Sequence, residues 1–135
     1  MNKIYKVGLI GCGHISETYF RAHEYFNNFK IIKCADIKES ASKNCASLYN
    51  IESVSVDDLL ADNQIEVVLN LTTPQAHYEV TKKTLLAGKH SYCEKPLSTK
   101  FENGQELVNL AKERFAPSRS APISQHPSIL CPSEL

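Results

Sequence analysis

The chain has 135 residues, of which 42% are hydrophobic and 22% charged, and its 15 basic and 15 acidic side chains cancel. This length suits one domain with a real core, and the charge balance argues against an electrostatic hold on nucleic acid or anionic lipid. Since every apolar run falls short of the roughly 20 residues of a membrane helix, we expect no nucleic-acid partner and no membrane partner.

The five cysteines are odd in number and include no CxxC pair. Both facts argue against a disulfide framework and against a zinc site. We therefore expect reduced thiols, most of them buried as small hydrophobes, and no metal. The N-terminus also lacks the pattern of a signal peptide, so the expected location is the cytoplasm.

Short apolar runs alternate with helical stretches along the chain. Strands are predicted at 6–10, 31–35, 53–56, 66–71 and 89–93, and helices at about 15–26, 40–49, from 57, at 77–87 and at 99–115. In the first helix, one face carries Ile15, Tyr19, Ala22, His23 and Phe26. Gly88 suits a helix C-cap, and Thr99 with Glu102 fits a capping box.

This alternation predicts an α/β fold with a Rossmann-like, doubly wound parallel sheet of about five strands, in the usual order 3-2-1-4-5. We expect this domain, of a type that binds nucleotides, to span residues 1–115. Residues 116–135 hold four of the six prolines, and proline at that density blocks both helix and central strand. We expect this segment to be a disordered tail.

The string Gly11-Cys12-Gly13-His14-Ile15-Ser16 stands between the first strand and the first helix. It approximates the dinucleotide fingerprint G-x-G-x-x-G/A, with a small Ser16 in the third place. A helix that begins here would direct its free amides toward phosphates. The string alone fits a tight turn without a ligand equally well.

Asp36 ends the second strand, 20 residues after Ser16. The fingerprint places there the carboxylate that accepts hydrogen bonds from the adenosine ribose. A carboxylate would repel a 2′-phosphate, which favours NAD over NADP, although the nearby Lys38 weakens that preference. The competing interpretation is a helix cap or a surface acid; the glycine turn favours cofactor binding.

Two further turns follow strands. Thr72-Thr73-Pro74 ends the strongest β run, with His77 three residues on, and ligands of open α/β sheets bind at such strand ends. A plain end of a strand and start of a helix explains these residues equally well, and His77 alone is more often a helix-start residue.

The other turn is Glu94-Lys95-Pro96, after the fifth strand. Here the Lys95 charge could stabilise an alkoxide or its amine could move a proton. By spacing alone, a surface Lys–Glu pair is the safer interpretation.

Taken together, GLIGCGHIS, CAD, TTP…H and AGKHSYCEKPLS resemble the Gfo/Idh/MocA oxidoreductases, the glucose–fructose oxidoreductase and inositol dehydrogenase family, from about Lys3 to Arg114. The resemblance implies an NAD(P)-dependent oxidoreductase acting on CH–OH groups of sugars or polyols, with Lys95 beside the nicotinamide as the catalytic residue. It implies cofactor-binding roles for Gly11, Cys12, Gly13, His14, Ile15, Asp36, Thr72, Thr73, Pro74, His77, Glu94, Lys95 and Pro96.

Members of that family continue into a second α/β domain with a large, mostly antiparallel sheet that carries the substrate pocket. Residues 116–135 show no such continuation, so we expect an incomplete active site, a fifth strand left as an open edge and marginal stability. A reading frame broken near codon 115 is one hypothesis. A naturally short, non-catalytic nucleotide-binding module is the alternative.

Overall fold

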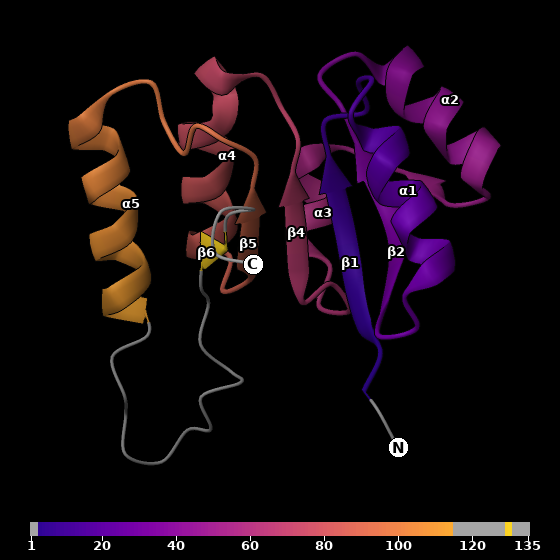
Figure 1. Cartoon of the computed structure of the whole chain (residues 1–135), viewed down its shortest axis with the longest axis horizontal. Coiled ribbons are helices and arrows are strands. Elements are labelled where there is room, and N and C mark those ends of the chain that lie inside the picture. Colours follow the sequence, from indigo (N-terminus) through magenta and orange to yellow (C-terminus); the bar gives the residue numbers. More distant parts are fainter. Residues whose placement is uncertain (1–2, 115–128, 131–135) are drawn as a thin grey trace.

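A computed structural model of the chain describes residues 3–114 and 129–130. Strands and helices alternate along it (Figure 1). In chain order the elements are β1 (Tyr5–Ile10), α1 (Ser16–Tyr25), β2 (Phe29–Ala35), α2 (Glu39–Tyr49), β3 (Glu52–Ser53), α3 (Val56–Ala61), β4 (Val67–Asn70), α4 (Pro74–Leu86), β5 (His90–Cys93), α5 (Phe101–Arg114) and β6 (Ile129–Leu130).

The strands form one parallel sheet in the order β3-β2-β1-β4-β5-β6. This confirms the predicted α/β class and the 3-2-1-4-5 order of the first five strands. Because the strands are parallel and joined by helices, all their carboxyl ends lie at one edge of the sheet, the upper edge in Figure 1.

Helices cover both faces of the sheet. On the face of α1 and α2, the buried core is apolar and includes Leu9, Phe20, Ile31 and Leu69. On the other face, α3 and the beginning of α4 pack on a second apolar cluster around Leu59. Burying both faces explains why the strands read as apolar runs rather than as alternating patterns.

The part of the sheet under α4 is polar instead. Beside apolar Val68 and Leu85, its fully buried side chains from β4, β5 and α4 include the polar Asn70, His77, Thr81, Thr84 and Ser91. Asn70 Nδ2 donates to Thr81 Oγ1 and to the His77 carbonyl, each over 3.0 Å. Hydrogen bonds, rather than apolar contacts alone, therefore hold α4 in place.

The predicted face of α1 is only partly confirmed: Tyr19, Ala22 and His23 are half-buried, and Tyr19 packs on the core. Ile15 and Phe26 are exposed by 43% and 57%, whereas Ser16 and Phe20 are buried. Phe20 stacks on Tyr49 of α2 with ring centroids 4.0 Å apart, so the helix is rotated toward α2. The apolar pattern is misleading because Ile15 is the N-cap and lies outside the helix.

Several boundaries also differ from the predicted ones. The third strand ends at Ser53, and Val56 opens α3, where the Ser55 side chain accepts a hydrogen bond from the Asp58 amide over 3.0 Å. The fourth helix begins at Pro74, not at His77, because proline has the backbone angle of a first helical residue. The last helix begins at Phe101, two residues after the predicted cap.

The fifth strand is not left as an open edge. Ile129 and Leu130 pair with Ser91 and Tyr92 as a short sixth strand, although the sequence predicts a disordered tail for the whole segment. These two residues lie between the prolines at 127 and 132, so their amides remain free to join a ladder. The rest of the predicted tail lies outside the described residues.

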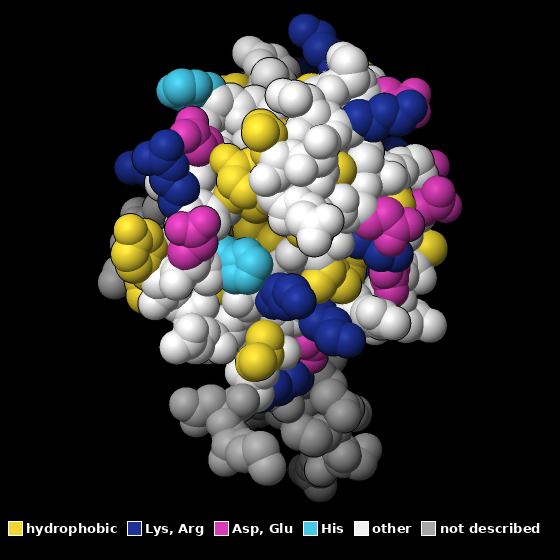
Figure 2. All heavy atoms as spheres, turned by 90° about the vertical axis from the view of Figure 1, so that its right-hand side faces the viewer, with side chains coloured by type: hydrophobic (Ala, Val, Ile, Leu, Met, Phe, Trp, Pro, Cys, Tyr) yellow, Lys and Arg dark blue, Asp and Glu magenta, His cyan; other side chains and the backbone are white. Residues whose placement is uncertain are grey.

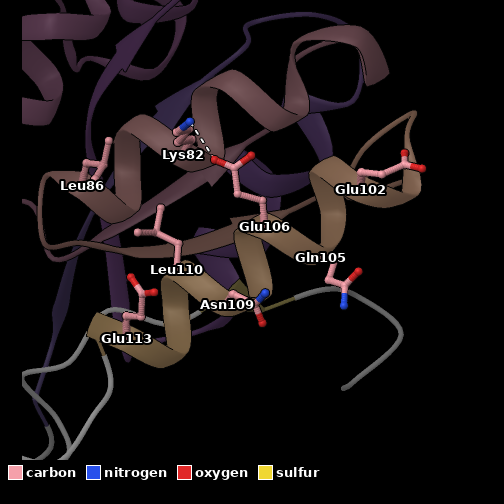
Figure 3. Close-up of a pocket in the computed structure, with 8 residues that line it drawn as sticks. All are labelled: Lys82, Leu86, Glu102, Gln105, Glu106, Asn109, Leu110 and Glu113. Carbon is pink, nitrogen blue, oxygen red and sulfur yellow. Dashed lines mark ion pairs between the residues drawn. The ribbon is translucent and has the colours of Figure 1, made fainter.

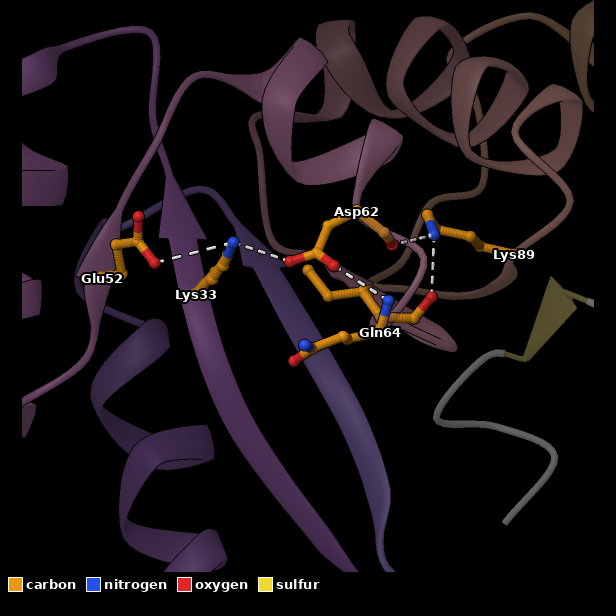
Figure 4. A network of polar contacts seen from close by, with 6 residues as sticks. Lys33, Glu52, Asp62, Gln64 and Lys89 are labelled. Atoms are coloured by element: carbon orange, nitrogen blue, oxygen red, sulfur yellow. Dashed lines mark hydrogen bonds and ion pairs between the residues drawn. The ribbon is translucent and has the colours of Figure 1, made fainter.

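A lysine network joins β2 and β3 to the end of α3 and to the residue before β5 (Figure 4). Lys33 Nζ lies 2.7 Å from Asp62 Oδ2 and 3.6 Å from Glu52 Oε2. Lys89, which is 6% exposed, donates to the carbonyls of Asp62 (2.6 Å) and Ile65 (2.8 Å). Lys89 thus supplies the donor for the Ile65 carbonyl and a second donor for the Asp62 carbonyl, which also accepts from the Ile65 amide over 3.2 Å.

Two further properties concern the surface and the thiols. Seen from the side of α1 and α2, side chains of both charge signs are interspersed with apolar ones (Figure 2). Cys12, Cys34 and Cys45 are buried free thiols and Cys93 is buried as well, as predicted; Cys131 lies outside the described residues. Within residues 3–114 and 129–130, no helix is long and apolar enough to cross a membrane.

Candidate functional site

Four turns meet at the carboxyl edge of the sheet. The last paired residue of β1, Ile10, lies opposite Ala35 of β2 and Asn70 of β4, and Asn70 lies opposite Cys93 of β5. The residues that follow these strands therefore emerge side by side. They include the glycine turn, Asp36, the Thr72–Pro74 turn and the Glu94–Pro96 turn, which the sequence singles out separately.

Gly11 is required by its surroundings. Its φ is +102°, and an added Cβ would lie 2.5 Å from the backbone carbon and oxygen of Leu71. A side chain there would combine left-handed strain with a backbone collision. The glycine turn and the turn after β4 are thus in direct contact, while on the other side the Gly11 amide donates to the Ala35 carbonyl over 2.9 Å.

Gly13 and Ser16 stand at the second and third glycine positions of the fingerprint. A Cβ on Gly13 would meet nothing within 4 Å, so the backbone is open to an approaching group. Ser16 is 2% exposed, and its hydroxyl donates to the Gly13 carbonyl over 2.6 Å. His14 and Ile15, between them, are exposed and precede the first turn of α1, where the Ser16 and Thr18 amides donate to the carbonyls of Gly13 and Ile15 over 3.1 Å.

Asp36 is bound to the glycine turn. Its Oδ2 accepts a hydrogen bond from the Cys12 amide over 2.7 Å, and its Oδ1 accepts one from the Lys38 amide over 2.8 Å. The carboxylate is half-buried, and each oxygen retains a lone pair for a further donor. The next residue, Ile37, is 99% exposed.

Cys12 connects the turn to the core beneath it. Its thiol lies 3.6 Å from the Ala35 carbonyl, and the neighbouring Cys34 thiol together with burial raises the pKa of Cys12. The thiol therefore stays protonated and acts as a packing group, while the Cys12 backbone amide faces Asp36.

The Thr72–Pro74 turn is held from inside by Asn70. The Asn70 Oδ1 accepts hydrogen bonds from the Thr72 hydroxyl (2.6 Å) and amide (3.3 Å), and its Nδ2 donates to the His77 carbonyl (3.0 Å). Thr73 is the N-cap of α4 and Pro74 its first residue. Both are exposed at the edge, next to the glycine turn.

His77 lies beneath this turn rather than at the surface. Its side chain is 1% exposed, its Nε2 lies 2.8 Å from the Thr72 carbonyl, and its Nδ1 lies 2.5 Å from the Pro96 carbonyl. Both ring nitrogens are therefore engaged by the backbone of two different turns.

The Glu94–Pro96 turn is held by α1. The Tyr19 hydroxyl donates a hydrogen bond to the Glu94 carboxylate, and burial together with this bond raises the pKa of Tyr19. Tyr19 also packs edge-on against Tyr92, with ring centroids 6.0 Å apart. Lys95 is exposed, with no ion pair in the part of the chain that the structure describes.

Tyr19 and Asn70 are the site residues that sequence reasoning misses. The sequence pattern presents Tyr19 only as an apolar position of α1, and Asn70 as part of an apolar strand. A polar side chain at the end of a buried strand, two residues before a threonine, is the available signal for Asn70.

This edge fits a dinucleotide. The glycine turn and the first amides of α1 suit a pyrophosphate, and the half-buried carboxylate of Asp36 suits ribose hydroxyls. In this strand order a dinucleotide would run from the β2 end, across β1, toward the ends of β4 and β5. Lys95 would then lie at its far half.

A different hollow, of about 470 Å³, lies between α4 and α5 (Figure 3). Glu102, Glu106 and Glu113 line it, and Lys82 pairs with Glu106 over 2.8 Å. Three carboxylates against one lysine leave the lining negatively charged, which would repel a diphosphate, so this hollow does not suit a dinucleotide.

Comparison with known proteins agrees with this geometry. Residues 5–117 match the sequence model described as GFO_IDH_MocA, an oxidoreductase family with an NAD-binding Rossmann fold. The chain is 36% identical over 91 residues to an uncharacterized oxidoreductase of Schizosaccharomyces pombe, covering 65% of this chain and 25% of that protein. It is 28% identical over 112 residues to inositol 2-dehydrogenase/D-chiro-inositol 3-dehydrogenase of Lactiplantibacillus plantarum, covering 80% of this chain and 32% of that protein.

Among solved structures, the WlbA dehydrogenase from Chromobacterium violaceum, in complex with NADH and UDP-GlcNAcA, superposes with a TM-score of 0.80 at 25% identity. The match covers 96% of this chain and 36% of that chain. The chain thus spans about a quarter to a third of the length of the curated relatives given above.

Proposed function

Because the chain belongs to the Gfo/Idh/MocA oxidoreductase family, whose members carry the NAD-binding Rossmann fold, we propose that residues 1–115 form its NAD(P)-binding domain and that the carboxyl edge of the sheet is the binding site. The observation that supports this best is Asp36, whose carboxylate is fixed to the glycine turn by the Cys12 amide. One rigid unit then offers both a ribose acceptor and a phosphate cradle.

The glycine turn would hold the pyrophosphate through backbone amides, because Gly13 leaves the backbone open and α1 begins directly behind it. Asp36 would accept hydrogen bonds from the adenosine ribose, as a half-buried carboxylate with free lone pairs can. The same negative charge disfavours a 2′-phosphate, so we propose NAD as the preferred cofactor, with NADP bound more weakly.

Lys95 would act at the other half of the site. When bound, the nicotinamide ring supplies or accepts the hydride. The exposed Lys95 ammonium can stabilise the oxygen of a substrate CH–OH group as that oxygen becomes an alkoxide, or exchange a proton with it. Glu94 and Pro96 would fix the turn that presents it, and Thr72, Thr73 and Pro74 would border the ring.

For the substrate, we propose a sugar or a polyol, supported by the relative named as an inositol dehydrogenase. The residues that read the substrate would lie in the second domain that the family resemblance implies, outside the residues matched here. We further propose the cytoplasm as its location, because the buried Cys12, Cys34 and Cys45 remain free thiols, which suits a reducing compartment.

Calorimetric titration of the purified chain with NADH, and separately with NADPH, tests the cofactor site. We expect NADH to bind, and NADPH to bind more weakly. A chain that shows a helical circular dichroism spectrum and a cooperative melt, yet binds neither, would refute the proposal.

Turnover separates the enzyme from a non-catalytic nucleotide-binding module. The chain, alone and mixed with the separately produced second domain of a family relative, is incubated with NAD⁺ and myo-inositol, and NADH is followed by its absorbance. Production of NADH that is lost in Lys95→Met, with NADH binding kept, supports an enzyme. Binding without turnover, on myo-inositol and on a panel of sugars, supports the module.

A further inference from the structure

The two turns at the nicotinamide half of the proposed site follow adjacent strands and continue past the end of the sheet. The ladder between β4 and β5 ends with the Glu94 amide, which donates to the Asn70 carbonyl over 3.2 Å. Thr72 and Pro96 lie past this point. There the ring of His77 spans the Thr72 and Pro96 carbonyls and so connects the two turns.

The position of His77 excludes direct contact with a ligand at the edge. The ring is 1% exposed, and each nitrogen faces a carbonyl oxygen, at 2.8 Å for Thr72 and 2.5 Å for Pro96. A carbonyl oxygen only accepts, so a ring with one N–H donates to one of the two carbonyls, and both contacts are hydrogen bonds together only when both nitrogens carry a proton. The ring therefore acts on the two turns and leaves no nitrogen for a cofactor.

Asn70 makes one side of this connection rigid. It accepts from the Thr72 amide and hydroxyl while it donates to the carbonyl of His77 itself. The Thr72 turn, the start of α4 and the imidazole therefore form one hydrogen-bonded unit. The His77 ring joins the Glu94–Pro96 turn, which presents Lys95, to that unit.

We propose that His77 is a positioning residue that sets the spacing between the Thr72–Pro74 and Glu94–Pro96 turns, and thereby aligns the nicotinamide half of the dinucleotide with Lys95. This inference rests on the proposed function. It assigns His77 no contact with the cofactor, in contrast to the binding role that the family resemblance implies.

Comparing the binding of NADH with that of a ligand that lacks the nicotinamide ring tests this role. ADP-ribose shares the adenosine, pyrophosphate and second ribose of NADH but lacks the nicotinamide ring. Three variants are compared: His77→Leu removes both ties, His77→Gln keeps a donor near the Nε2 position, and His77→Asn keeps one near the Nδ1 position. His23→Leu is the control, since His23 packs on Phe29, with ring centroids 6.0 Å apart, away from the edge.

We expect NADH affinity to fall about tenfold in all three variants, the loss that corresponds to about 1.4 kcal/mol, because the bridge needs both contacts. ADP-ribose affinity should stay within about twofold of the wild type. The fluorescence gain of NADH at saturation should also fall, since the ring is less well held. His23→Leu should change none of these. Equal losses for both ligands, or unchanged NADH affinity, would overturn the inference.

A measurement on the unaltered chain covers the case in which the variants do not fold. With ¹⁵N-labelled histidine, the His77 ring signals should move when NADH is added and stay in place with ADP-ribose. Identical responses to the two ligands would count against the positioning role. Failure of the wild-type chain to bind either ligand is a separate result, since it would refute the proposed function itself.

Discussion

Asp36→Asn separates the two tasks that the proposed site assigns to this side chain. In the structure, the carboxylate accepts from the Cys12 amide at 2.7 Å and from the Lys38 amide at 2.8 Å. Asparagine supplies one acceptor oxygen, and its amide group must face the other N–H as a second donor. One backbone amide therefore loses its partner, whichever way the side chain is turned.

The magnitudes follow from these hydrogen bonds. An amide left without a partner costs about 1–3 kcal/mol, and for a domain of this size each kcal/mol lowers Tm by roughly 4–8 °C. Two ribose hydroxyls that bonded to a carboxylate would each lose about 1 kcal/mol against a neutral acceptor. That sum, about 2 kcal/mol, is an approximately 30-fold rise in the Kd for NADH.

Calorimetry with NADH and NADPH, beside a thermal melt, measures both effects. The Kd for NADPH should rise less than that for NADH, because the substitution also removes the charge that repels the 2′-phosphate. Asp57→Asn, an exposed acid in the first turn of α3, is the matched control. If Asp36→Asn left the NADH affinity unchanged, or if Asp57→Asn lowered it equally, the assigned role of Asp36 would be wrong.

Three further substitutions test the framework of the site. Gly11→Ala should destabilise the chain by about 3 kcal/mol, because it adds left-handed strain to a backbone collision; a wild-type urea midpoint would contradict this. Lys89→Met should cost about 2 kcal/mol, since the Ile65 carbonyl loses its donor and the Asp62 carbonyl keeps only the Ile65 amide; the control Lys83→Met, on an exposed lysine, should cost almost nothing. The hydrogen bond from Lys33 lowers the pKa of Asp62 from its ordinary value of 3.8, so this pair stabilises the fold above that pH and the contribution is lost as pH falls further. Asp62→Asn should therefore flatten the loss of stability in acid, and an unchanged acid melt profile would refute this.

Much of the fold could be predicted from the sequence because its signals are local. Strands buried on both faces read as apolar runs, and Gly88 ends α4 with a φ of +79°, as a helix C-cap requires. The edge at which the turns meet also follows from parallel order alone. Because the glycine turn and Asp36 follow adjacent strands of such a sheet, their spacing in the sequence predicts that they lie side by side.

Other features depend on contacts that no local pattern encodes. The rotation of α1 is set by the stacking of Phe20 on Tyr49, from another helix. The bond from Tyr19 to Glu94 joins residues 75 positions apart, and the burial of His77 depends on the path of the Glu94–Pro96 turn. A histidine at the start of a helix gives no sign that a second turn will pass over it.

The polar packing under α4 gives the two sides of the sheet different tolerance to sequence change. Apolar neighbours such as Leu9 and Ile31 can be exchanged for others of similar volume, because such cores repack. Asn70 and Thr81 offer no such freedom, since a shift of α4 by even part of a turn removes whole directional bonds. In a library selected for nucleotide binding, substitutions should accumulate beneath α1 and α2, while the residues beneath α4 should stay as they are.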